Sequence, residues 1–197
     1  MHAIGDRAVA MALDAMEHGG PRFPDAPADR IEHAQLVRAA DRPRFGELDV
    51  TASIQPIHCA SDRDLAEACW ADRLGDAYAY RSLAAAGARL AFGTDAPIES
   101  VNPWHTLFAA MHRRMPRDDT PDWRPAETID AATALAAMTA GPAVAAGRTD
   151  LGHLRPGAVA DLAVLSTDLT TLLAGDEPVA DIRSLLTLVD GKEVHRA

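Results

Sequence analysis

The stretch Arg89-Leu90-Ala91-Phe92-Gly93-Thr94-Asp95-Ala96-Pro97 joins a short apolar run to a polar turn. Residues 89–92 predict a buried β-strand, because a short apolar run bounded by turn residues is typical of one. The chain then turns through glycine and proline, with Asp95 between them. This places a carboxylate just past the end of a strand, where α/β folds carry their chemistry.

Upstream segments repeat this arrangement with histidine in place of aspartate. Residues 30–35 predict a strand that ends in polar residues, among them His33. The β-branched residues 50–54 predict a further strand, and His58 follows it in the sequence Gln-Pro-Ile-His. His2 is interpreted in the same way, as a strand-end histidine. The sequence therefore places four polar, chemically competent side chains after strands.

Helices are predicted between these strands. Asp6 is interpreted as the N-cap of the first helix and Ser61 as the cap of the third, and a proline-rich loop spans residues 21–27. The helices expected from apolar spacing and stop signals cover residues 7–17, 39–48, 62–70 and 78–86. Strands that alternate with helices are typical of βα units around a parallel sheet, so the fold class is predicted to be α/β.

The character of the chain changes after Asp95. Residues 103–115 and 126–146 each predict a helix, a turn-rich link follows at 151–157, and residues 158–165 and 185–189 predict strands. Asp190-Gly191 is a strong hairpin signal. We therefore divide the chain at about residue 150, with an α/β body over 1–150 and a small β segment over 151–197.

Composition excludes several classes of function. The 197 residues carry a formal net charge of -10, which argues against nucleic acid or anionic membrane as a partner. Cys59 and Cys69 do not form a disulfide framework, and no apolar run is long enough to span a membrane. Because the first six residues lack the regions of a signal peptide, a cytoplasmic location is predicted.

The strand-end residues suggest a metal site. Neutral imidazole and carboxylate are the usual ligands of catalytic zinc, and His2, His33 and Asp95 can supply them. Each residue alone has a plainer interpretation: a histidine that only packs, or an aspartate that only fixes a turn. Cys59 beside His58 suggests either a thiol nucleophile or a small buried hydrophobe.

Taken together and in order, four motifs resemble one family. They lie at residues 2–6 (His-Ala-Ile-Gly-Asp), 30–35 (Arg-Ile-Glu-His-Ala-Gln), 55–58 (Gln-Pro-Ile-His) and 93–97 (Gly-Thr-Asp-Ala-Pro). They resemble the amidohydrolase superfamily, in particular amidohydrolase family 3, which includes N-substituted formamide deformylase. Residues 152–162 and 190–194 resemble the segments with which these proteins enter and close a second, β-sandwich-like domain.

The resemblance implies a fold and a set of roles. It implies the C-terminal half of a metal-dependent hydrolase TIM barrel, strands five to eight, plus part of a small β-sandwich-like domain. It assigns His2, His33 and Asp95 to a divalent metal, with zinc the first candidate. Asp95 would also be the general base, and His58 would lie near the substrate and orient its carbonyl. The implied reaction is hydrolysis of carbon–nitrogen bonds other than peptide bonds, on a small amide-type substrate.

The sequence also departs from the family pattern. It contains no His-x-His pair, which the family carries at barrel strand one, and its single lysine, Lys192, lies in the predicted closing hairpin rather than at strand four. The first half of the barrel is therefore expected to be absent. We expect either self-association or a separate N-terminal half as partner, because open barrel edges leave backbone groups unpaired.

Other interpretations stay open at this stage. The chain could instead be a non-catalytic fragment or a subunit of a split amidohydrolase. Deaminase and lactonase activities are further alternatives, because fold does not fix function. Trp104, Phe108 and Trp123 are candidates either for a hydrophobic pocket or for packing.

Overall fold

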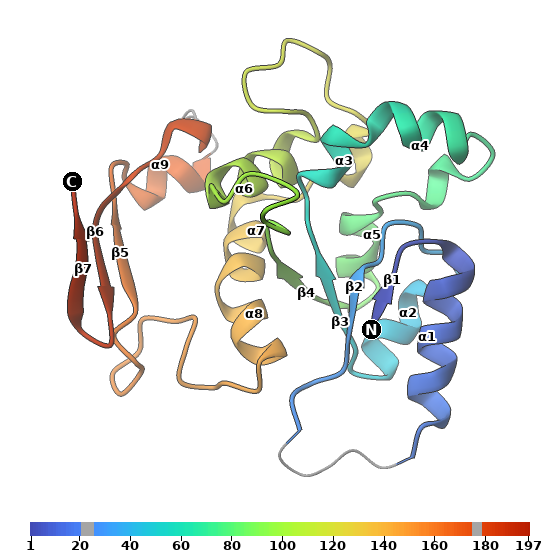
Figure 1. The fold of residues 1–197 in the computed structure, drawn as a ribbon, viewed down its shortest axis with the longest axis horizontal. Coiled ribbons are helices and arrows are strands. Elements are labelled where there is room, and N and C mark those ends of the chain that lie inside the picture. The colour runs from blue at the N-terminus through green and yellow to red at the C-terminus, as the bar shows by residue number, and fades with distance from the viewer. Residues whose placement is uncertain (21–25, 175–178) are drawn as a thin grey trace.

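A computed structural model describes residues 1–20, 26–174 and 179–197. Its body is a four-stranded parallel sheet in the order β1 (His2–Ala3), β2 (Arg30–His33), β3 (Thr51–Ile54) and β4 (Arg89–Phe92) (Figure 1). The predicted α/β class and parallel sheet are confirmed. The part of the predicted proline-rich loop at residues 21–25 lies outside the described residues.

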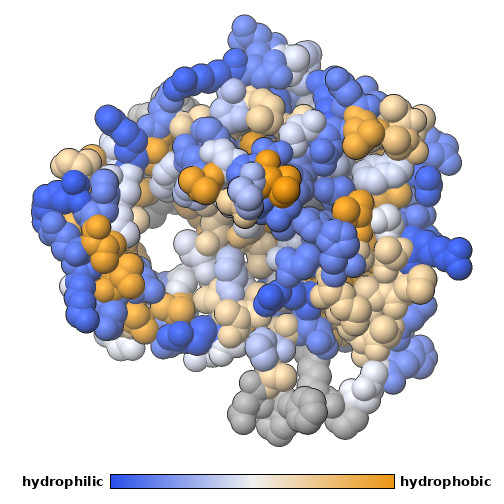
Figure 2. Space-filling model, in the orientation of Figure 1, coloured by the Kyte–Doolittle hydropathy of each residue, from blue (hydrophilic) through white to orange (hydrophobic). Residues whose placement is uncertain are grey.

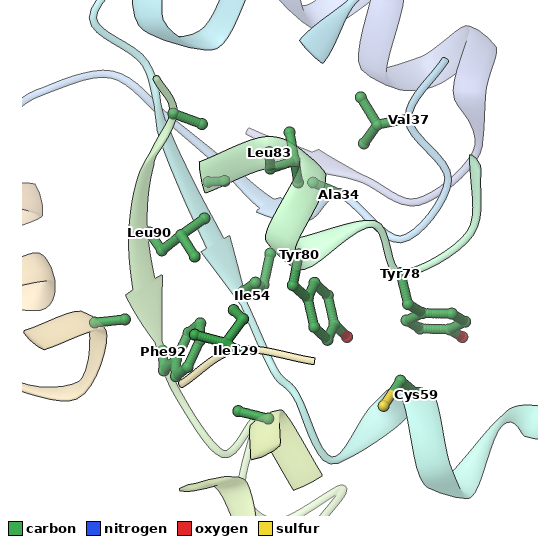
Figure 3. Packing of buried hydrophobic residues seen from close by; sticks show 14 of the residues in the cluster. Ala34, Val37, Ile54, Cys59, Tyr78, Tyr80, Leu83, Leu90, Phe92 and Ile129 are labelled. Atoms are coloured by element: carbon green, nitrogen blue, oxygen red, sulfur yellow. The ribbon is translucent and has the colours of Figure 1, made fainter. Parts of the chain in front are cut away.

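The sheet has one apolar and one polar face. Ile31, Ala52 and Leu90 lie side by side through the strand register and are buried. They pack with aliphatic and aromatic side chains from the surrounding helices and loops, part of which Figure 3 shows. On the opposite face Glu32 pairs in register with Ser53, and both remain half-buried. Burial of the apolar row fixes the register, because a slip of one residue would turn it to the polar side.

The helices of the first half follow the predicted pattern with shifted ends. They are α1 (Asp6–His18), α2 (Arg42–Glu47), α3 (His58–Ser61), α4 (Arg63–Cys69), the 3-10 turn η1 (Leu74–Asp76) and α5 (Tyr80–Ala85). Both predicted caps are wrong. Asp6 is the first residue of α1, and its carboxylate pairs with Arg38 and Arg73. Ser61 is the last residue of α3, where its hydroxyl donates to the Ile57 carbonyl.

The second half contains α6 (Pro103–His112), the turn η2 (Pro125–Glu127), α7 (Ala131–Met138) and α8 (Ala140–Ala145). The prediction of one helix over 126–146 is wrong, because the chain breaks at Thr139. The break lets α8 approach the backbone of β4 at Gly141. A Cβ added there would lie 2.1 Å from the Leu90 carbonyl oxygen, so only glycine permits this contact.

The C-terminal segment forms a separate antiparallel sheet of β5 (Leu162–Leu165), β6 (Ser184–Val189) and β7 (Lys192–Arg196). The predicted hairpin at residues 190–191 joins β6 to β7. Between β5 and β6 lie α9 (Leu169–Ala174), which was not predicted, and η3 (Val179–Asp181). Figure 2 shows hydrophobic side chains gathered on this sheet, where Val164, Leu185, Val189 and Val194 are exposed. No helix among the described residues is long and apolar enough to cross a membrane.

Candidate metal centre

The parallel sheet brings the predicted site residues to one edge. His2 lies in β1, His33 ends β2, His58 begins α3 just after β3, and Asp95 follows β4. The carboxyl ends of parallel strands meet at the same edge of a sheet. All four side chains line one cavity of about 530 Å³.

Three of these residues form a compact group. His33, His58 and Asp95 each offer one ligand atom, and these atoms lie within 4.8 Å of one another. Nε2 of His58 lies 3.7 Å from Oδ2 of Asp95. The His2 ring is outside this group but lies edge-on to the His33 ring, with centroids 4.5 Å apart. Thus the candidate ligand atoms of His33, His58 and Asp95 lie close together, and the His2 ring lies beside His33 at the edge of this group.

The backbone is unusual at the same place. His33 (φ 74°), Ala34 (φ 41°) and Asp95 (φ 57°) all adopt left-handed conformations. Such conformations are uncommon for residues other than glycine and collect at functional sites. Here they turn the chain sharply at the ends of β2 and β4, and they present His33 and Asp95 to the cavity.

Two glutamines that the sequence analysis did not single out support the histidines. Oε1 of Gln55 lies 2.9 Å from Nδ1 of His33, and Nε2 of Gln35 lies 3.2 Å from Nδ1 of His58. Both glutamines are buried. Their position within the motifs 30–35 and 55–58 was the available signal, because a polar side chain beside a candidate ligand often orients it.

The wall of the cavity is largely apolar and includes Leu65, Trp70, Tyr78 and Ile98. The Tyr78 hydroxyl donates to Oδ2 of Asp62 at 3.0 Å. Burial, and then the nearby Asp62 carboxylate, raise the pKa of Tyr78 well above its usual value, so the phenol stays protonated. This wall was not predicted.

The aromatic residues proposed as pocket candidates belong to the core instead. Phe108 and Trp123 are buried, Trp104 packs against the core, and none of them lines the cavity. The indole of Trp123 donates to Glu67 at 2.8 Å. Packing is therefore the correct interpretation of these three residues.

Cys59 is enclosed in the core rather than open to the cavity. It lies beside the rings of Tyr78 and Tyr80 (Figure 3), and it is fully buried. Burial raises the pKa of the Cys59 thiol to about 11. A protonated, inaccessible thiol is a poor nucleophile, which favours the interpretation as a small buried hydrophobe.

Comparisons with known proteins identify the relatives of this chain. The sequence profile of the amidohydrolase family matches residues 1–195. The chain is 37% identical over 201 residues to Protein LONG AFTER FAR-RED 3 of Arabidopsis thaliana, covering 99% of this chain and 33% of that protein. It is 25% identical over 195 residues to N-substituted formamide deformylase of Arthrobacter pascens, covering 97% of this chain and 35% of that protein.

A solved structure shares the fold. An uncharacterised metal-dependent hydrolase from Pyrococcus horikoshii OT3 superposes with a TM-score of 0.74 at 33% identity. The match covers 98% of this chain and 35% of that one. The chain thus spans about a third of the length of the proteins it matches.

Proposed function

This chain belongs to the amidohydrolase family, and from that premise we propose that it carries part of a metal-dependent centre that hydrolyses carbon–nitrogen bonds other than peptide bonds. The observation that carries the proposal is that His2, His33 and Asp95, with His58 beside them, line one cavity at one edge of the sheet. Imidazole and carboxylate on separate strands are the donor set of a catalytic divalent metal such as zinc.

The side chains fit such an ion. The hydrogen bond from Nδ1 of His33 to Gln55 leaves Nε2 of that ring free to bind a metal, and a metal-bound histidine commonly donates its other ring nitrogen to such a partner. We assign His2, His33 and Asp95 as ligands. A divalent ion held there supplies Lewis-acid activation of water and of a carbonyl group.

Asp95 is proposed as the general base. Its carboxylate projects into the cavity from the turn after β4, where it can accept a proton from an attacking water. The same carboxyl can then deliver that proton to the departing nitrogen, which is a poor leaving group until protonated. One residue thereby serves as base and then as acid.

His58 is proposed to hold the substrate. Its Nε2 is buried and has no hydrogen-bond partner among the described residues. A substrate carbonyl oxygen would satisfy this atom, and burial would strengthen the bond. Beyond it, Leu65, Trp70 and Ile98 offer an apolar surface. We therefore propose an amide or formamide with an apolar substituent as substrate.

The finer fold assignment is part of this proposal. We propose that β1 to β4 correspond to strands five to eight of a TIM barrel within residues 1–150, and that residues 151–197 contribute to a sandwich-like domain. The two outer strands, β1 and β4, pair on one side only within the described sheet. We propose that a polypeptide with the remaining ligands, or a second copy of this chain, covers them. A cytoplasmic location is likewise proposed.

A complementation assay tests the function. The chain is combined with an N-terminal half from a family relative that carries the His-x-His pair. Hydrolysis of N-substituted formamides is measured with zinc and after treatment with a chelator. We expect turnover that requires both halves and is lost on chelation. Metal-bound but inactive assemblies would favour the alternative, a non-catalytic subunit, and would contradict the proposal.

A further inference from the structure

We propose that Gln35 and Gln55 hold His58 and His33 in opposite tautomers, so that His33 is committed to ligating a metal and His58 to donating a hydrogen bond. Gln35 then acts as a positioning residue that keeps His58 out of the ligand set. The tautomers are properties of this chain alone. The roles that we attach to the tautomers, a metal ligand for His33 and a hydrogen-bond donor to the substrate for His58, rest on the proposed function.

The state of His33 follows from its partner. A neutral imidazole carries one N–H and one lone pair on its two nitrogens. Oε1 of Gln55 is an acceptor and lies 2.9 Å from Nδ1 of His33, so Nδ1 carries the proton. Nε2 of His33 is left with its lone pair, which is what a metal requires.

The state of His58 is the reverse. The amide nitrogen Nε2 of Gln35 is a donor, and it lies 3.2 Å from Nδ1 of His58, so Nδ1 must accept. The proton of the neutral His58 ring then lies on Nε2. A second observation supports this, because Nε2 of His58 faces Oδ2 of Asp95 at 3.7 Å. An N–H beside a carboxylate is favourable, whereas a lone pair there would be repelled.

Each glutamine bonds the histidine at the end of the neighbouring strand rather than the histidine of its own segment. Gln35 follows His33 by two residues but serves His58, while Gln55 precedes His58 by three residues but serves His33. Each of the two motifs therefore supplies the glutamine that orients the histidine ring of the other motif. The crossing also locks the spacing of the two rings, which stack with centroids 6.0 Å apart.

The main chain is anchored at both glutamines. The backbone carbonyl of Gln35 accepts from the Tyr78 amide at 2.6 Å, and the backbone carbonyl of Gln55 accepts from the Tyr80 hydroxyl at 3.4 Å. Gln35 and Gln55 are only 8% and 7% exposed, so bulk water has little access to either residue. Hydrogen-bond partners of this kind fix the tautomer and orientation of the rings they touch.

Nitrogen NMR of the whole chain, labelled with ¹⁵N at histidine, tests this directly. Spectra are recorded at about pH 8.5, and the ¹⁵N shifts distinguish protonated from unprotonated ring nitrogens. His33→Gln and His58→Gln variants assign the signals. We expect protonated Nδ1 in His33 and protonated Nε2 in His58. The same tautomer in both rings would overturn the inference.

One substitution at two positions gives a matched pair. Gln35→Glu replaces a donor by an acceptor, so Nδ1 of His58 should become protonated. Gln55→Glu exchanges one acceptor for another, so His33 should keep its protonated Nδ1. Gln35→Met, which has no amide, should leave His58 as a mixture of tautomers. A His58 signal unchanged in both Gln35 variants would also overturn the inference. If a variant fails to fold, the wild-type spectrum still decides.

The outcome separates this inference from the proposed function. If the two histidines have opposite tautomers but the chain never supports hydrolysis, the proposed function is contradicted and the inference about the glutamines stands. If an assembly hydrolyses the substrate while its two histidines have the same tautomer, the inference is contradicted and the proposed function stands.

Discussion

The imidazole ring of His33 stacks on that of His58, with centroids 6.0 Å apart and planes inclined by 16°. The two residues come from the ends of neighbouring strands, yet they have different supports and different neighbours. His33 has the His2 ring edge-on to it, and His58 faces Asp95. Similar position therefore does not imply equal function.

Separate substitution of the two histidines should show this difference. In the complemented enzyme, His33→Ala should reduce metal content, because it removes a ligand. His58→Ala should leave metal content near the wild-type value and lower turnover, because it removes only a donor to the substrate. Elemental analysis and rate measurements on the same samples check both. Equal metal loss in the two variants would contradict the assignment.

Asp95→Asn should nearly abolish hydrolysis in the same assembly. Loss of general acid–base catalysis typically costs about a hundred- to ten-thousand-fold in rate. Asparagine suits this position as a control of structure, because it tolerates the left-handed backbone found at Asp95 better than most residues do. Thermal unfolding of the metal-free chain should therefore be nearly unchanged. Turnover close to wild type would rule out the role of proton carrier.

The two cysteines should differ sharply toward a thiol reagent. Cys69 is exposed, whereas Cys59 is buried with its pKa raised to about 11. Near pH 8 Ellman's reagent should modify one thiol quickly and the other only after unfolding. Cys69→Ser should remove the fast phase. A fast phase that persists in this variant would show that Cys59 is accessible.

Asp130 should stabilise the protein in a pH-dependent way. As N-cap of α7 it accepts from the Thr133 amide at 2.9 Å, and this bond lowers the pKa of the Asp130 carboxyl below its usual value. A lowered folded-state pKa gives a contribution that is complete above the unfolded value and fades as the pH falls through the folded value. Asp130→Ala should therefore cost about 1 kcal/mol at pH 7, and less in acid.

Asp130→Asn is the matched control, because its side-chain oxygen can still cap the helix but does not titrate. Urea unfolding between pH 7 and about pH 3 measures all three proteins. A cost of Asp130→Ala that stays constant over this range would contradict the charge contribution.

Gly141→Ala should destabilise the fold. The added methyl would meet the Leu90 carbonyl at 2.1 Å, so α8 must move away from β4. Overpacking of this kind costs about 1–3 kcal/mol. Gly75→Ala is the control, because a Cβ there meets nothing within 4 Å. Equal free energies of unfolding for the two variants would show that α8 adjusts freely.

The sequence alone determined the sheet and the chemistry of its edge. Strand 89–92 was predicted with its observed ends, and the strands at 30–35 and 50–54 were predicted to within two residues. Short apolar and β-branched runs between turn residues are typical of buried strands, so local sequence sufficed to find them. The prediction that His33, His58 and Asp95 follow successive strands also needed only local order along the chain.

Only the tertiary structure decided how these residues are supported and what surrounds them. The crossed bonds of Gln35 and Gln55 join residues 23 and 22 positions apart, and they depend on strand register. The break at Thr139 comes just before Gly141 and Pro142, which are poor helix formers, and the tertiary structure decides that α8 then packs on β4 at Gly141. The cavity wall at Trp70 and Tyr78 likewise comes from contacts between distant segments. Periodicity reports which side chains turn inward, whereas the partner that each one meets is set by packing across the fold.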